Sequence, residues 1–149
     1  MSGTEQVTDE LPAAMREEID AHRRRVAADP RRRPDLAGAL QRYGLVLGVH
    51  GHRKEARLVL EEAVALYRTD PGAHRQDLAA ALIGLGNQLA ELGRHEQALD
   101  HMREAVGLHR EAGGRPLASA LTDLGIALGE AGRHEEAAGV LAPPGLVLA

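Results

Sequence analysis

The chain has 149 residues, a formal net charge of −4 and no cysteine, phenylalanine or tryptophan. Without cysteine it can form neither a disulfide nor a thiolate zinc site, and its negative charge gives no overall attraction for nucleic acid, a polyanion. The length suits one domain. No apolar run approaches the roughly 18 residues that span a bilayer, and the start lacks the basic and apolar segments of a signal peptide, so we expect a soluble, cytoplasmic protein.

The N-terminal part is expected to comprise a disordered start, residues 1–10, and one helix, residues 11–28. The segment from Ile19 to Arg23 aligns with two later segments, 64–68 and 106–110, which lie near the ends of predicted helices. This alignment predicts that residues 11–28 form a lone helix capping the structure that follows. Residues 11–149 would then be a single domain.

Three copies of one pattern follow, at residues 35–68, 77–111 and 117–141. Successive copies are offset by 42 and then 39 residues. A repeat of this length is typical of a solenoid, in which each unit buries its apolar face on its neighbours and the stack presents an extended concave surface. Proline-bearing segments separate the copies, because proline does not continue a helix interior.

Each copy predicts two helices that pack together as a hairpin. In the first helix, apolar residues recur at offsets of three and four, which is one stripe at helical period. The stripes are Leu40, Tyr43 and Leu47, then Leu82, Leu85 and Leu89, then Leu121, Leu124 and Leu128. A glycine beside the middle member of each stripe would let the second helix come close. These glycines are Gly44, Gly86 and Gly125, and they correspond to Ala56, Ala98 and Ala137 of the second helices, which are followed by Leu60, Met102 and Leu141.

A second set of glycines, Gly51, Gly93 and Gly132, lies between the two helices of each copy. A glycine at the end of a helix adopts a positive φ at little cost, so these residues are predicted to end the first helices.

The last copy is short. Residues 134–141 supply only about two helical turns before Pro143 and Pro144, and the tail, residues 142–149, is apolar. An uncovered solenoid end exposes apolar surface. Three alternatives follow: the tail folds back over the last hairpin, this end pairs with another molecule, or the chain is part of a longer protein.

The motifs resemble those of the tetratricopeptide repeat family, in particular a long repeat of roughly 42 residues found in kinesin light chains and many bacterial regulatory proteins. The resemblance rests on Leu85-Gly86 with Leu89, on the turn from Gly93 to Ala98, and on Glu104-Ala105-Val106. It implies an all-α fold, a right-handed α-α superhelix of about seven helices comprising three hairpins and the N-terminal cap. It also implies a non-catalytic role in protein–protein interaction.

In this family the concave groove is built mainly from first-helix residues that face away from the hairpin partner. By alignment the resemblance assigns the groove to Gln41, Leu45, Val49, Ile83, Asn87, Glu91, Thr122, Ile126 and Glu130. Apolar residues with Glu91 and Glu130 at one edge suit an amphipathic or extended peptide that bears basic residues. Only Asn87 matches the carboxylate clamp of the chaperone-binding members. Alternatively, the apolar positions pack against adjacent first helices.

Nothing in the sequence indicates catalysis. Neither Ser2 nor Ser119 lies in a Gly-x-Ser-x-Gly turn, and no glycine loop for phosphate is present, so we expect no enzymatic activity and no cofactor. His50 and His52 are close, but a pair without a third ligand is a weak metal site. The other histidines, His22, His74, His95, His101, His109 and His134, are spread along the repeats, so we predict no metal site.

Two arginine runs, Arg23–Arg25 and Arg31–Arg33, concentrate positive charge near the N-terminus. Such runs can bind nucleic acid or an acidic partner, but no aromatic residues are interleaved to stack on bases. Neutralisation by nearby acids is the simpler interpretation. The acids are Glu17, Glu18, Asp20, Asp29 and Asp35.

The leading hypothesis is therefore an adaptor that binds a partner peptide or helix in its groove. The second is a homo-oligomeric assembly module, for example a homodimer, that pairs through its short C-terminal end. The third is binding of nucleic acid or an acidic partner through Arg23–Arg25 and Arg31–Arg33. Membrane binding is not expected.

Overall fold

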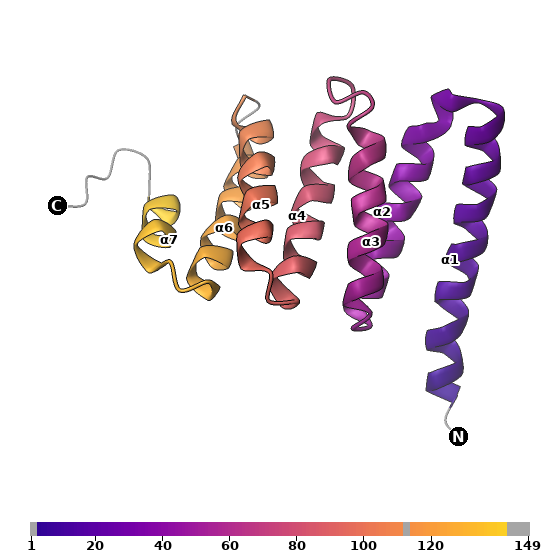
Figure 1. Ribbon diagram of the computed structural model, residues 1–149, viewed down its shortest axis with the longest axis horizontal. Helices are drawn as coiled ribbons and strands as arrows, with labels where there is room; N and C mark the ends of the chain where they lie inside the picture. Colours follow the sequence, from indigo (N-terminus) through magenta and orange to yellow (C-terminus); the bar gives the residue numbers. More distant parts are fainter. Residues whose placement is uncertain (1–2, 112–113, 143–149) are drawn as a thin grey trace.

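The computed structural model describes residues 3–111 and 114–142, with side chains described from residue 12 onward. These residues form seven α-helices and one 3-10 turn, with no strand among them. The helices are α1 (Gly3–Ala28), α2 (Arg33–Val49), α3 (Arg53–Tyr67), α4 (Arg75–Glu91), α5 (His95–Arg110), α6 (Gly114–Glu130) and α7 (His134–Leu141), and the turn is η1 (Pro30–Arg32). They stand in one row, with α1 at one end and α7 at the other (Figure 1). The predicted all-α solenoid is confirmed.

The hairpins are α2 with α3, α4 with α5, and α6 with α7, while α1 packs on α2 as a cap. Each hairpin turns at a glycine of positive φ, which is 82° at Gly51, 78° at Gly93 and 79° at Gly132. The residue after the glycine donates its N–H back to the first helix, as in the 2.8 Å bond from His52 N to Leu47 O. This bond satisfies a carbonyl that the helix end would otherwise leave free. The predicted helix-ending glycines are confirmed.

The helices of a hairpin approach most closely at the predicted glycines. A Cβ atom added at Gly44 would lie 2.6 Å from Cγ of Leu60, and one added at Gly125 would lie 2.5 Å from Cγ of Leu141. Gly86 faces Met102 and the backbone carbonyl of Ala98 in the same way. The second helix occupies the space that the missing side chain leaves, so these glycines are required by packing.

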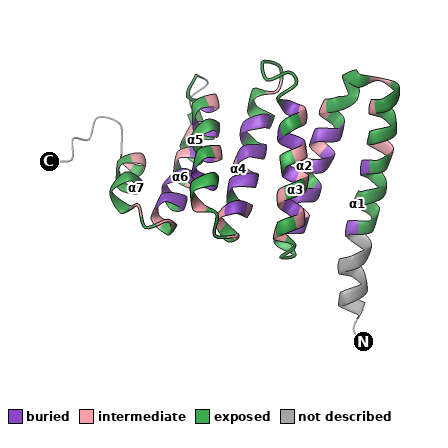
Figure 2. Cartoon of the chain, viewed as in Figure 1, coloured by how far each residue is buried: buried purple, intermediate pink, exposed green. Residues whose placement is uncertain are grey.

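Leucine and alanine fill the core in place of large aromatic residues. Buried positions lie where the helices face one another, and exposed positions lie on the outside of the row (Figure 2). The predicted stripes are buried in α2 and α4, but in α6 Leu121 is only half-buried. Its equivalents Leu40 and Leu82 pack along full-length second helices, whereas α7 ends at Leu141 and leaves the first turns of α6 less covered.

Helix α1 begins at Gly3 rather than at residue 11, where the sequence placed the boundary between a disordered start and the capping helix. Pro12 lies inside this helix. An internal proline costs about 3 kcal/mol, but no glycine or second proline interrupts residues 4–11, so their helix propensity favours continuation.

None of the helices in residues 3–111 and 114–142 has the length and hydropathy to cross a bilayer. Apart from Ala142, the predicted apolar tail lies outside the described residues, so the three alternatives for the C-terminal end stay predictions.

Candidate functional site

The first helices of the hairpins form one continuous face of the solenoid, since α2 touches α4 and α4 touches α6. Several residues predicted to line a groove are exposed on this face although they are large and apolar. The exposed fraction is 52% for Leu45, 85% for Val49 and 54% for Ile126. An apolar surface of this kind suits contact with another molecule.

A cavity of about 120 Å³ lies between α4 and α6. Its lining includes four of the predicted groove residues, Asn87, Glu91, Ile126 and Glu130. The other lining residues are Ala90, Met102, Asp123 and Ala127. We call this surface the α4–α6 groove. It brings three carboxyl groups and one amide around an exposed isoleucine.

Asp123 is the most unusual of these groups because it is partly buried and has no counter-charge. Burial raises the pKa of the Asp123 carboxyl above its ordinary value, since a poorly solvated carboxylate is disfavoured. Within residues 12–111 and 114–142, neither Asp123 nor Glu130 forms an ion pair, while Glu91 pairs with Arg53 at 3.4 Å. The groove therefore keeps a surplus of negative charge.

Acidic residues on the second helices are arranged differently, because arginines of neighbouring repeats pair with them. Arg68, which directly follows α3, donates to Glu104 of α5 at 2.6 Å, and Arg23 of α1 pairs in the same way with Glu62 of α3. These pairs link one repeat to the next. The unpaired carboxylates of the α4–α6 groove thus stand out against a surface on which many acids have partners.

The remaining predicted groove residues do not line this cavity. Gln41 accepts a hydrogen bond from the hydroxyl of Tyr67 at 3.2 Å, so it is engaged between α2 and α3. Ile83 is half-buried and packs against the core on both sides, as the alternative interpretation expected. Thr122 is exposed, and its hydroxyl donates to the Ala118 carbonyl at 2.9 Å. Leu45 and Val49 extend the exposed face over α2.

Sequence reasoning missed Asp123. The alignment of the repeats gave no signal at this position, because the equivalents of Asp123 are Arg42 and Gly84, which are not acidic. A signal was nevertheless present: Asp123, Ile126, Ala127 and Glu130 have the spacing i, i+3, i+4, i+7, which places them on one side of a helix.

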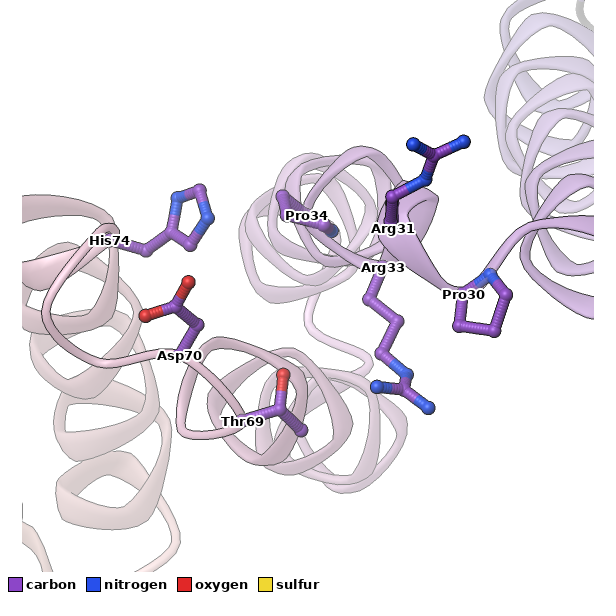
Figure 3. A pocket seen from close by; sticks show the side chains of 7 residues that line it. All are labelled: Pro30, Arg31, Arg33, Pro34, Thr69, Asp70 and His74. Atoms are coloured by element: carbon purple, nitrogen blue, oxygen red, sulfur yellow. The ribbon is translucent and has the colours of Figure 1, made fainter.

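A second cavity, of about 330 Å³, lies where the loop before α2 meets the loop before α4. Asp70 and His74 lie on one side of it, and Pro30, Arg31 and Arg33 on the other (Figure 3). Arg31 is occupied by Asp29, with 3.0 Å between Nε and Oδ1. Because both signs of charge line this cavity, it indicates no particular ligand.

The arginine runs are partly neutralised, as expected. Asp29 and Asp35 pair with Arg31 and Arg32, whereas Arg23 pairs with Glu62 of α3 rather than with an acid of its own segment. Among the described side chains, Arg24, Arg25 and Arg33 form no ion pair. Nucleic-acid binding is untested by this arrangement and stays a prediction.

The repeat-equivalent histidines lie in different hairpins: His95 begins α5 and His134 begins α7. The described part of the chain contains no cluster of three or more histidine, aspartate or glutamate side chains positioned to hold a metal ion.

Part of the chain matches a family model, and its fold resembles solved structures. A tetratricopeptide repeat model matches residues 77–141. BtubC (BKLC) from P. vanneervenii is similar in structure, with a TM-score of 0.72 at 18% identity over 89% of this chain and 54% of that chain. This chain therefore spans about half the length of BtubC.

MamA gives a TM-score of 0.56 at 16% identity over 95% of this chain and 91% of that chain. A second MamA structure gives 0.52 at 17% identity, over 94% and 89% of the two chains. No curated protein matches the sequence. Residues 77–141 therefore match tetratricopeptide repeats, and the glycine-turned hairpins of the whole row share the solenoid fold of BtubC and MamA.

Proposed function

We propose that the chain is a non-catalytic interaction module whose α4–α6 groove binds a segment of a partner protein. The segment carries a basic side chain next to an apolar one. Tetratricopeptide repeats are generally protein-interaction modules, and this coarse role comes with the family. Leu45 and Val49 offer further apolar contact along α2.

Asp123 is the observation that carries this proposal. A partly buried carboxylate without a cation is costly, and a cation from a partner would offset that cost. Ile126 supplies an apolar contact beside it, and Glu130 and Asn87 supply further acceptors. The arrangement is complementary to an arginine or lysine with an apolar neighbour.

The size of the cavity favours a side chain over a free small molecule. Pockets for small molecules usually have volumes of about 300–1,000 Å³, whereas this one has about 120 Å³. A cavity of this size admits the end of one long side chain. The rest of the bound segment would lie along the exposed face.

Peptide display tests the proposal. A random peptide library is selected on the immobilised chain, and enriched peptides are synthesised with each arginine kept or replaced by citrulline, which has a similar shape and no charge. We expect enriched peptides to combine a basic and an apolar residue. Citrulline should weaken binding about tenfold, which corresponds to about 1.4 kcal/mol.

The matched variants are D123N/E130Q in the groove and E17Q/E135Q outside it. Glu17 and Glu135 are exposed, and neither forms an ion pair with the described side chains, so both variants lose the same charge. Only the groove variant should lose affinity. Equal losses in both, or no enrichment of basic peptides, would overturn the proposal.

A second candidate function is self-assembly through the C-terminal end. Leu141 is 52% exposed, whereas its repeat equivalents Leu60 and Met102 are fully buried. Light scattering on the intact chain, on a chain stopped at Ala142 and on L141D tests this candidate. A monomer in all three cases excludes it, and association that L141D abolishes supports it.

A further inference from the structure

The two halves of the chain differ in charge balance. Residues 1–68 contain twelve basic and eleven acidic groups, whereas residues 69–149 contain six basic and eleven acidic groups. Because the helices stand in a row, this imbalance runs along the long axis of the molecule (Figure 1). Opposite potentials on two surfaces favour and orient their encounter.

The α1 end of the row has three arginines that form no ion pair with the described side chains. Arg24 and Arg25 lie in the last turns of α1, and Arg33 begins α2 beside the cavity of Figure 3. All three are exposed. We call them the basic corner. Their neighbours Arg23, Arg31 and Arg32 are held by acids of the same chain, but the basic corner has no such partners among the described residues.

Small side chains accompany these arginines. Ala28 is exposed and lies one turn after Arg24, so the two share a face of α1. The α4–α6 groove presents the complementary surface, with the unpaired Asp123 and Glu130 around the exposed Ile126.

We propose that the basic corner of one copy docks in the α4–α6 groove of a second copy. This inference rests on the proposed function, since it names a partner for the same groove. Arg24 and Arg25 would supply the cations that Asp123 and Glu130 lack, and Ala28 would contact Ile126. Because the contact joins two different surfaces, a row of docked copies keeps one unoccupied groove at one end and one unoccupied basic corner at the other. Such contacts produce open chains or rings rather than two-fold dimers.

Salt dependence is the first expected property. The contact consists mainly of exposed charges, which are screened over about 10 Å at 0.1 M salt. In sedimentation velocity at low ionic strength, the weight-average mass should rise with concentration. At high ionic strength it should return to the monomer mass of 15.9 kDa. A monomer at every concentration in low salt overturns the inference.

Charge reversal identifies the surfaces. The corner variant R24E/R25E and the groove variant D123K/E130K should each be monomeric, because like charges meet at the contact. An equimolar mixture of these two variants should assemble. The acidic corner of R24E/R25E is then complementary to the basic groove of D123K/E130K, and the two unchanged surfaces are complementary to each other. A chain carrying all four changes should assemble alone. A mixture that stays monomeric contradicts the docking.

Each variant is checked for helical content and unfolding temperature. If D123K/E130K does not fold, D123N/E130Q replaces it, and its mixture with R24Q/R25Q should stop at 1:1 dimers. Larger assemblies in that mixture, or no association, contradict the proposal.

Two results separate this inference from neighbouring ones. Peptides that bind the groove of a chain that stays monomeric would overturn the self-docking and leave the proposed function intact, whereas absence of any groove binding would overturn both. Association that survives high salt and is lost in L141D would assign assembly to the C-terminal end instead.

Discussion

Leu141 lies over Gly125 in the last hairpin as Leu60 lies over Gly44 in the first. The contact is the same, but its surroundings differ: Leu60 is fully buried and Leu141 is 52% exposed. Helix α4 covers α3 and Leu60, whereas no described helix follows α7. The repeat therefore fixes the contact, and the position in the stack decides how much it stabilises.

Truncating these two leucines should accordingly have unequal effects. Leu60→Ala should lower the free energy of unfolding by about 2–5 kcal/mol, because it leaves a cavity in a closed core. Leu141→Ala should cost less than about 1 kcal/mol, since solvent already reaches this side chain and surface changes have small effects. Urea unfolding followed by circular dichroism measures both, and equal losses would contradict the difference in burial.

Gly86→Ala should destabilise the chain although alanine is the better helix former. The new Cβ would lie 2.9 Å from Cγ of Met102 and 3.2 Å from the backbone carbonyl of Ala98, so α5 would have to move. We expect a loss of about 1–3 kcal/mol.

Gly107→Ala is the matched control, because a Cβ there meets nothing within 4 Å. It should stabilise α5 by about 0.5–1 kcal/mol. The same urea experiment compares the two, and a Gly86→Ala chain as stable as Gly107→Ala would disprove close packing as the reason for the glycine.

Tyr43→Phe should loosen the capping helix. The Tyr43 hydroxyl accepts a bond of 2.8 Å from Nε of Arg16 and donates one of 3.0 Å to Glu55, so it joins α1, α2 and α3. Each lost bond is worth about 1 kcal/mol. Amide hydrogen exchange should accelerate in α1. Tyr67→Phe loses only the bond to Gln41 and should leave α1 unchanged; acceleration of α1 in both variants would argue against the network.

Asp123→Asn should weaken peptide binding in the α4–α6 groove and raise the stability of the folded chain. Burial raises the pKa of Asp123 in the folded chain above its value in the unfolded chain. The ionised carboxylate therefore lowers stability at pH values above the folded pKa, and this penalty is relieved as the pH falls through that pKa. At neutral pH the variant should unfold at a higher temperature than the unchanged chain, with no gain once the pH lies below the unfolded value of about 3.9. Calorimetry across pH measures this, and a constant difference at all pH values would refute it.

The sequence predicted those features that depend on local rules. A helix end with a positive φ favours glycine, which made Gly51, Gly93 and Gly132 identifiable. The leucine stripes were identifiable because buried residues of a helix recur at the helical period. The start of α1 was placed at residue 11 because the prediction rested on the alignment of residues 19–23 with later segments, which does not locate the beginning of the helix. Gln41 was assigned to the groove by alignment, which does not reveal that its amide oxygen also accepts a hydrogen bond from the Tyr67 hydroxyl.

Asp123 shows why the candidate site was only partly predictable. Its neighbours Asn87, Glu91 and Ile126 followed from repeat positions. Asp123 has no counterpart of the same chemistry in the other repeats, and its importance comes from burial and from the absence of a counter-charge among the described side chains. Both properties arise only when α4 and α6 are packed together.

The central claim is that the α4–α6 groove receives a basic side chain from another protein segment. Its most direct test is a titration of the isotope-labelled chain with an enriched arginine peptide, followed by amide chemical shifts. We predict shifts concentrated at Asn87, Asp123 and Ile126 that disappear in D123N/E130Q and with the citrulline peptide. Shifts confined to α3 and α5, or unchanged in that variant, would contradict the claim.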